Sequence, residues 1–291
     1  ETFLLIPGEE ITDRFQKHEV HINALNIEEV IRPQRGGSVQ STIQRNLDAV
    51  IEHGKLTGRE VLAHLNHPNF AWSITVENLA ALRGERFFEI YNGHRSTFHE
   101  GDDTHPSTEE MWDQALVLRL VEGAGDGELL YGLATDDAHN HYVVDEVSVP
   151  GRGWVMVRSG ALDTEEIIRA MKAGDFYATS GVVLKDVRRK GDVLEIDIDS
   201  APGVDYLTEF IVTRIKDGKP GAVGEIAASS DSTSPRYVMQ GDELYVRARI
   251  TSTRLHPRPY REGDFEIAWT QPMRPNESRD ILPQPSTDTH G

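Results

Sequence analysis

Short apolar runs alternate with helical hydrophobic periodicities through roughly the first 180 residues of the chain. Between two of these runs, the segment 39–55 carries Ile43, Leu47 and Val50 at the spacing that places them on one face of a helix. Strands that alternate with helices are typical of βαβ units with parallel strands. The pattern therefore predicts an α/β domain over residues 1–182. Its six predicted strands are 3–12, 19–27, 60–67, 86–92, 129–137 and 153–159.

Capping signals support the predicted helices. Ser107 precedes Glu110 by three residues, and Asp163 precedes Glu166 by three residues, which is the pattern of a capped helix start. The predicted helices are 39–55, 75–85, 107–125 and 163–175.

The pattern changes after about residue 182. Short strands with alternating apolar residues follow one another, and polar glycine-containing turns such as KGD, KDGKPG and QGDE separate or border them. No helical periodicity stands out in this part of the sequence. We therefore predict a small antiparallel, sandwich-like all-β domain over 183–275, followed by a polar, proline-rich tail over 276–291.

Composition narrows the class of protein. The formal net charge of −18 and the lack of a basic stripe argue against a nucleic-acid partner. The chain has no cysteine, which excludes disulfides and thiolate-bound zinc, and no apolar stretch long enough for a membrane-spanning helix. The sequence opens without Met inside an apolar run, so we expect a truncated or processed start, and the compartment stays open.

Histidines and carboxylates collect near the ends of the predicted strands, and ten of the twelve histidines lie within residues 1–141. The carboxyl ends of parallel strands meet at one edge of a sheet, so these side chains are expected to share one site. A single such histidine is more often a structural residue, but several neighbouring ones with carboxylates indicate a site for Zn²⁺, Mn²⁺ or Fe²⁺. The candidates are Glu9, Glu10, His21, His64, His67, His94, Asp136, Asp137 and His139.

Five short segments of the sequence resemble motifs of one protein family. PGEEIT, HINALN, LNHPN, EIYNGH and ATDDAH occur in an order that resembles the PHP (polymerase and histidinol phosphatase) superfamily of metallohydrolases. The segment 160–181 resembles the end of that domain in a branch with an all-β extension, which includes carbaryl-hydrolase-like proteins. The resemblance covers about residues 1–182 and implies a distorted (β/α)₇ barrel with two or three divalent metal ions at its mouth.

The resemblance also implies a role for each matching residue. It makes Glu10 the carboxylate that bridges two metal ions, with Glu9 pointing to the other face of the strand. It makes Asp137 both a metal ligand and the proton acceptor. His94 is the group expected to assist the leaving group, with His139 as the alternative. The implied metal ligands are Glu10, His21, His67, Asp137 and His139. The residues expected beside the ligands or facing substrate, with surface or capping roles as the alternative, are Glu9, His64, Asp136, His141 and Arg95.

The sequence departs from the family at its start. The family's first strand carries an H-x-H motif and its second strand ends in a D-H pair, and neither precedes PGEEIT in this chain. Six parallel strands are also too few for a seven-stranded barrel. We therefore expect the chain to begin at the third strand of the barrel. The alternatives are that a partner chain supplies the other ligands or that the chain is a degenerate member.

Three functions follow as hypotheses. The superfamily as a whole favours hydrolysis of a phosphoester by a metal-activated water, with Arg95 as the nearest candidate for holding a phosphate. The branch with the all-β extension favours a carboxylester or carbamate hydrolase. The missing ligands favour a non-catalytic binding or structural protein. The expected partner is a small-molecule ester or phosphoester, without nucleic acid or membrane, and a homo-oligomer is possible.

Overall fold

The computed structural model describes residues 3–141 and 147–275. These residues form four α-helices and fifteen strands, and the strands make three sheets, none of which closes into a barrel. Strand residues make up 35% of the chain and helical residues only 19%, so the structure is mostly β. The prediction of a (β/α)₇ barrel is therefore wrong.

The first sheet has five strands in the order of the sequence. Its first two strands, β1 and β2, form an antiparallel hairpin, β2 also pairs antiparallel with β3, and the remaining pairs are parallel. Two residues join β1 to β2, whereas a parallel crossover needs about a dozen residues, so the hairpin is the only geometry open to this connection. The strands are β1 (Gly8–Phe15), β2 (His18–Leu25), β3 (Leu62–Leu65), β4 (Phe87–Asn92) and β5 (Tyr131–Thr135).

The structure has a helix in each of the four predicted segments, although the helix predicted over 75–85 is only five residues long. Ser38 and Ser107 each accept a hydrogen bond from the backbone of the third helical residue of α1 and α3. Both helices end at a glycine in the left-handed conformation, Gly58 and Gly123. The helices are α1 (Val39–Thr57), α2 (Val76–Ala80), α3 (Thr108–Glu122) and α4 (Thr164–Lys172), and a 3₁₀ turn, η1, spans Phe70–Trp72. None of these helices has the length and apolarity needed to cross a membrane.

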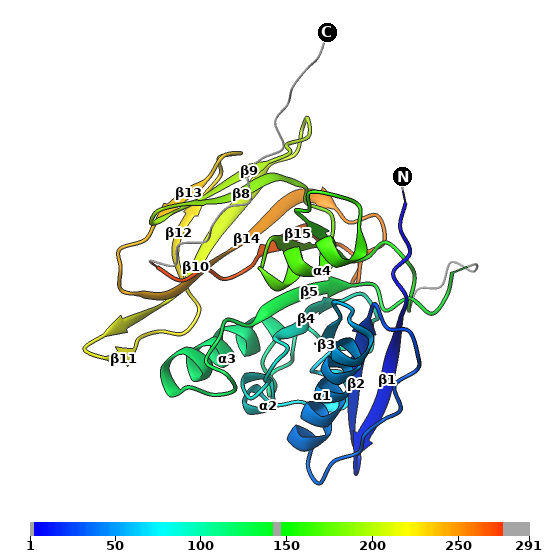
Figure 1. Ribbon diagram of the computed structural model, residues 1–291. Coiled ribbons are helices and arrows are strands. Elements are labelled where there is room, and N and C mark those ends of the chain that lie inside the picture. The colour runs from blue at the N-terminus through cyan, green and yellow to red at the C-terminus, as the bar shows by residue number, and fades with distance from the viewer. Residues whose placement is uncertain (1–2, 142–146, 276–291) are drawn as a thin grey trace.

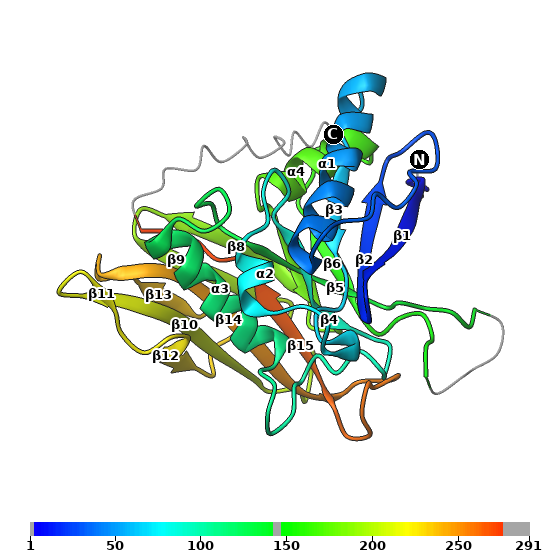
Figure 2. The same cartoon turned by 90° about the horizontal axis from the view of Figure 1, so that it is seen from below.

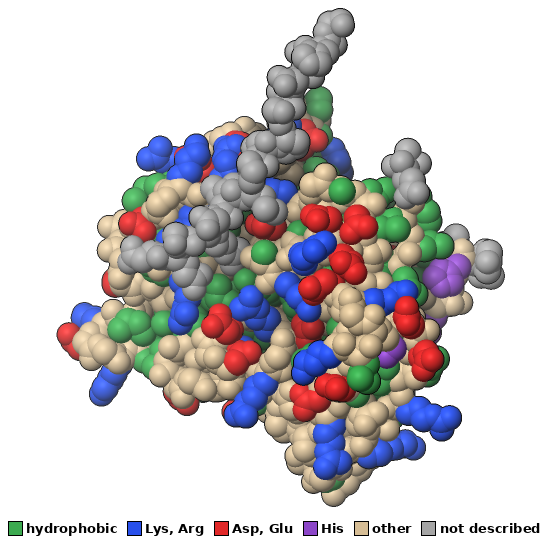
Figure 3. All heavy atoms as spheres, in the orientation of Figure 1, with side chains coloured by type: hydrophobic (Ala, Val, Ile, Leu, Met, Phe, Trp, Pro, Cys, Tyr) green, Lys and Arg blue, Asp and Glu red, His purple; other side chains and the backbone are tan. Residues whose placement is uncertain are grey.

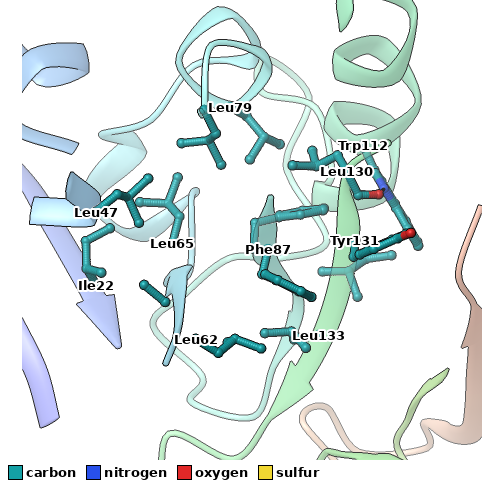
Figure 4. Close-up of a cluster of buried hydrophobic side chains, with 14 of the residues drawn as sticks. Ile22, Leu47, Leu62, Leu65, Leu79, Phe87, Trp112, Leu130, Tyr131 and Leu133 are labelled. Atoms are coloured by element: carbon teal, nitrogen blue, oxygen red, sulfur yellow. Dashed lines mark hydrogen bonds between the residues drawn. The ribbon is translucent and has the colours of Figure 1, made fainter. Parts of the chain in front are cut away.

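Helix α1 covers one face of the first sheet, and the main core lies between them (Figures 1 and 2). Leu47 of α1 packs with Ile22 of β2 and Leu65 of β3 in this core, which continues toward Trp112 of α3 (Figure 4). The Trp112 indole is fully buried and donates a hydrogen bond from Nε1 to the Leu130 carbonyl at 2.8 Å. The alternating apolar residues of β1 and β2 face this core and leave the opposite face of the hairpin polar.

The remaining strands form the second and third sheets. The second sheet has seven strands in the order β11, β10, β14, β15, β7 and β6, with β12 beside β10, and the third has the order β13, β9 and β8. These strands are β6 (Trp154–Val157), β7 (Phe176–Thr179), β8 (Leu184–Lys190), β9 (Val193–Ile198), β10 (Tyr206–Lys216), β11 (Lys219–Pro220), β12 (Glu225–Ser230), β13 (Arg236–Val238), β14 (Glu243–Leu255) and β15 (Phe265–Thr270).

The sixth predicted strand does not join the first sheet. Strand β6 pairs antiparallel with β7, and β7 pairs antiparallel with β15, so one sheet contains strands from both sides of residue 182. The two faces of this sheet serve two cores: Ala178 and Trp269 belong to the first, and Tyr177 and Ala268 belong to the second. The domain division at 182/183 stays a prediction, and the predicted tail 276–291 lies outside the described residues.

Candidate metal centre

Three predicted ligands converge on the polar face of the hairpin. Glu10 of β1 lies opposite Asn23 of β2, and His21 lies two residues away on the same face of β2, so Glu10 and His21 are diagonal neighbours. His67 follows the end of β3, the next strand of the sheet. Its φ of +22° lies in the left-handed region, which non-glycine residues rarely adopt and which occurs preferentially at functional sites.

The spacing of the three ligand atoms fits a single metal ion. The Nδ1 atom of His21 lies 3.2 Å from Oε1 of Glu10 and 3.3 Å from Nε2 of His67, and the latter lies 3.6 Å from the same oxygen. Ligand atoms bound at about 2.0–2.1 Å to a tetrahedral ion are roughly 3.3–3.4 Å apart. Two imidazoles and one carboxylate are also ligands that Zn²⁺, Mn²⁺ and Fe²⁺ accept. No other such group of three occurs within residues 3–141 and 147–275.

Neighbouring side chains hold these ligands in place. Asn66 donates from Nδ2 to Oε1 of Glu10 at 2.8 Å and to Oδ1 of Asn23 at 3.0 Å. The second ring nitrogen of His21, Nε2, lies 3.8 Å from a carboxylate oxygen of Glu19. This separation is too long for a hydrogen bond, so the Glu19 carboxylate acts on the His21 ring through its charge.

The electrostatics of the cluster favour a cation. Hydrogen bonds from His21 and then His67 hold the pKa of the Glu10 carboxyl far below its usual range, against the opposing effect of burial. Burial disfavours the charged form of His67, but the hydrogen bond to Glu10 and the carboxylates of Glu89 and Asp137 outweigh it and raise the pKa of His67. Glu10 is therefore a carboxylate at neutral pH, and the surroundings of His67 attract positive charge.

Glu89 links His67 to Asp137 through hydrogen bonds, and it is not among the site residues predicted from the sequence. Its carboxylate is only 2% exposed and accepts hydrogen bonds from the His67 backbone N–H at 2.7 Å, from Asn92 at 2.8 Å and from Thr135 at 2.9 Å. The same Asn92 amide reaches Oδ2 of Asp137 at 3.2 Å. Burial raises the pKa of Glu89. The signal available in the sequence was a lone acidic residue inside the apolar run RFFEIYN.

Replacing Glu89 tests this positioning role. Glu89→Leu removes the carboxylate oxygen that accepts from the His67 N–H and from the Asn92 amide, so the left-handed backbone at His67 loses its anchor. We expect Zn²⁺ or Mn²⁺ to bind about 10–100-fold more weakly, the usual loss for a residue that supports a metal ligand. Isothermal titration calorimetry measures the affinity. The matched control is Glu85→Leu, at a buried glutamate that pairs with Lys172, and equal affinities for the two variants would contradict the assignment.

Asp137 and His139 form a second group with His94, outside the three-ligand cluster. The His139 ring is 63% exposed and its Nδ1 atom contacts the Asp137 backbone carbonyl at 2.9 Å. The His94 and His139 rings lie 5.4 Å apart, centroid to centroid. Asp137 also adopts a left-handed φ, of +49°. The structure thus places Asp137 near enough to His67 to act on it electrostatically, but it does not bring Asp137 and His139 together with the other three predicted ligands.

The other predicted site residues lie elsewhere. Glu9 points away from Glu10 and accepts a hydrogen bond from the Ile31 N–H at 2.6 Å. The Asp136 carboxylate accepts three backbone N–H bonds from residues 151–153 and so shapes that turn. Arg95 donates to the Pro259 carbonyl at 3.4 Å, and His141 is exposed.

His64 is buried beside Glu89. Its Nδ1 atom lies 3.9 Å from Oε1 of Glu89 and has no hydrogen-bond partner among the described residues. Burial lowers the pKa of His64 to about 4, with a further contribution from His67. The His64 ring is therefore neutral at physiological pH and can accommodate a cation next to it.

Comparisons with known proteins return no relative: no family model, no curated protein and no solved structure matches the chain. The resemblance to the PHP superfamily stays a prediction that rests on the five motifs.

Proposed function

We propose that the protein is a divalent-metal-dependent hydrolase of a small ester, with a phosphoester as the first candidate. The observation that carries this proposal is the convergence of Glu10, His21 and His67, whose ligand atoms lie 3.2–3.6 Å apart. The Glu10 side chain is 35% exposed, so solvent and a substrate can reach the cluster. A bound divalent ion supplies a Lewis acid and lowers the pKa of a water at this point.

The second group supplies proton transfer. The backbone N–H of Ser96 donates to Nδ1 of His94 at 3.2 Å, so in the neutral ring the proton resides on Nε2. Burial lowers the pKa of His94, which keeps the ring neutral near pH 7. The neutral ring is too weak an acid to give up this proton, so the Nε2–H would donate a hydrogen bond to the leaving-group oxygen. The Asp137 carboxylate, held by Asn92, would accept a proton from the attacking water and return it to the leaving group.

One observation favours the second candidate, a carboxylester or carbamate hydrolase. The half-buried Phe70 ring lies 5.2 Å from the His67 ring and 5.9 Å from the His21 ring, which gives the cluster an apolar wall. The guanidinium of Arg95, the predicted phosphate-binding group, contacts the carbonyl of Pro259 instead. An ester with an apolar substituent suits this surface better than a small, highly charged phosphate does.

Metal removal and reloading test the proposal. The protein is treated with a chelator, dialysed, and supplied with Zn²⁺, Mn²⁺ or Fe²⁺ before its metal content is measured. We expect at least one equivalent of metal, and hydrolysis of p-nitrophenyl phosphate or 1-naphthyl N-methylcarbamate that the chelator removes and the metal restores. The preferred substrate decides between the two ester classes. Metal retention without turnover would leave a non-catalytic binding protein, and less than one equivalent would refute both enzyme hypotheses.

A further inference from the structure

A cavity lies between the start of α3 and one face of the seven-stranded sheet (Figure 2). It occupies about 740 Å³, which is within the range of sites that enclose small organic ligands. Every second residue over 247–251 of β14 and over 265–269 of β15 lines it, as expected where one face of a sheet forms a wall. No residue of the metal cluster belongs to the lining, and neither does His94 or Asp137, so this cavity is separate from the proposed hydrolase centre.

The two arginines of the cavity wall are already neutralised by carboxylates. Arg247 forms ion pairs with Asp113 and Glu109. Arg249 forms ion pairs with Glu109 and Glu209. Three carboxylates therefore surround two guanidinium groups, and no positive charge is left for an anionic ligand. Figure 3 shows the same neighbourhood of acidic and basic side chains over much of the face that it draws.

Other carboxylates of the lining have no such partner. Asp264 forms no ion pair with any residue of 3–141 or 147–275; its Oδ2 accepts a hydrogen bond from the Arg261 N–H at 2.6 Å, which leaves Oδ1 available. The Arg261 guanidinium pairs with Glu100 instead. Glu110 accepts hydrogen bonds from Ser107 at the start of α3 and likewise has no ion pair within the described ranges. The cavity consequently carries an excess of negative charge.

Two neutral side chains of the lining add hydrogen-bond acceptors. Nδ1 of His99 lies 3.1 Å from the Asn92 carbonyl oxygen, which can only accept, so Nδ1 carries the proton and Nε2 the free lone pair. Burial lowers the pKa of His99 to about 4 and so keeps the ring neutral. The Tyr91 ring lies 4.6 Å from the His99 ring and is only 7% exposed, and within the described part of the chain its hydroxyl has no hydrogen bond. Burial and then the Asp264 carboxylate raise the pKa of Tyr91, so the hydroxyl stays protonated.

We propose that this cavity binds a small primary amine, as its ammonium ion, with an apolar body. A primary ammonium group has three N–H donors, and the acceptors available to it are Asp264 Oδ1, the Tyr91 hydroxyl and His99 Nε2. The apolar body lies against Trp269, whose ring is 5.7 Å from the Tyr91 ring, and against Phe265, which is 43% exposed. Burial of this body is favoured by the hydrophobic effect, and the excess of carboxylates selects a cation over an uncharged ligand of the same shape.

The test uses phenethylamine as the probe and phenethyl alcohol as its uncharged counterpart. Binding to the full chain is measured by calorimetry at pH 7, where the amine is protonated. We expect one phenethylamine per chain, an affinity at least about tenfold above that of the alcohol, and a loss of affinity as salt is raised. Absence of phenethylamine binding, or equal binding of the alcohol, would overturn the proposal.

Two substitutions in the same loop locate the ammonium group. Asp264→Asn removes the charge but keeps an oxygen that can accept from the Arg261 N–H, so the turn is retained. Glu262→Gln is the matched control, because Glu262 is exposed and is not part of the lining. We expect Asp264→Asn to weaken phenethylamine binding about tenfold without affecting the alcohol, and Glu262→Gln to weaken it less than about twofold. Equal effects of the two substitutions would overturn the assignment.

A third substitution tests the interior of the cavity. Tyr91→Phe removes a hydroxyl that bonds to no described residue, so it leaves the fold intact and is expected to weaken phenethylamine binding several-fold. Wild-type affinity in this variant would remove the hydroxyl from the proposed site. Glu10→Gln is expected to bind phenethylamine like the wild type, and a loss in that variant would place the amine at the metal centre and overturn the proposal.

Discussion

Glu10→Gln is expected to remove metal binding and, with it, hydrolytic activity. The substitution replaces the carboxylate with a neutral amide at the atom on which the His21 and His67 nitrogens converge. The loss of affinity should exceed about 100-fold, the upper end of the range for residues that only support a ligand. Metal content after dialysis and the rate of ester hydrolysis measure the effect.

Glu9→Gln is the matched control, because the two glutamates are adjacent and differ in the face of β1 that they occupy. The Glu9 carboxylate accepts a hydrogen bond from the Ile31 N–H on the side away from the cluster, and a glutamine oxygen can still accept it. We expect Glu9→Gln to retain metal and activity. Wild-type metal content in Glu10→Gln would rule out Glu10 as a ligand, and an equal loss in both variants would indicate a folding defect.

Asp113→Asn is expected to cause the largest loss of stability. Asp113 of α3 binds the Arg247 guanidinium of β14 through Nε at 2.9 Å and Nη2 at 2.7 Å, and Tyr245 donates to the same carboxylate at 2.8 Å. Arg247 is only 1% exposed; burial opposes its charge, but the Asp113 carboxylate outweighs this and raises the pKa of Arg247. Loss of the Asp113 charge leaves the buried Arg247 guanidinium with the Glu109 carboxylate alone, 3.3 Å from Nη1, and removing one partner of a buried ion pair costs about 3–5 kcal/mol.

Urea denaturation measures this loss, and two comparisons show whether it comes from the buried pair. Glu52→Gln breaks an exposed ion pair with Lys55 and should cost less than about 1 kcal/mol. The double variant with Asp113→Leu and Arg247→Met removes both charges, and we expect it to regain most of the stability lost in Asp113→Asn. A cost for Asp113→Asn as small as that of Glu52→Gln would show that the pair does not hold α3 against the second sheet.

The predictions that depended on interactions between residues close in sequence were correct, whereas a prediction that depended on strand pairing was wrong. Helix α1 was predicted from its apolar spacing and helix α3 from the Ser107 and Glu110 capping pattern, and each signal lies within one short segment. The partner of β6 was predicted wrongly, because pairing depends on residues far along the chain and its apolar residues suit either sheet. The short link between β1 and β2 was the one local signal that already excluded parallel strands.

The candidate metal centre shows the same difference between what the sequence and what the structure determine. The sequence by itself determined which groups carry metal-binding chemistry, since Glu10, His21 and His67 stand out by type and by their position near strand ends. Only the tertiary structure decided that these three converge, because the distances of 3.2–3.6 Å depend on the register of β1 with β2 and on the left-handed backbone at His67. Side-chain type is a local property of the sequence, whereas register and backbone conformation result from packing across the whole sheet.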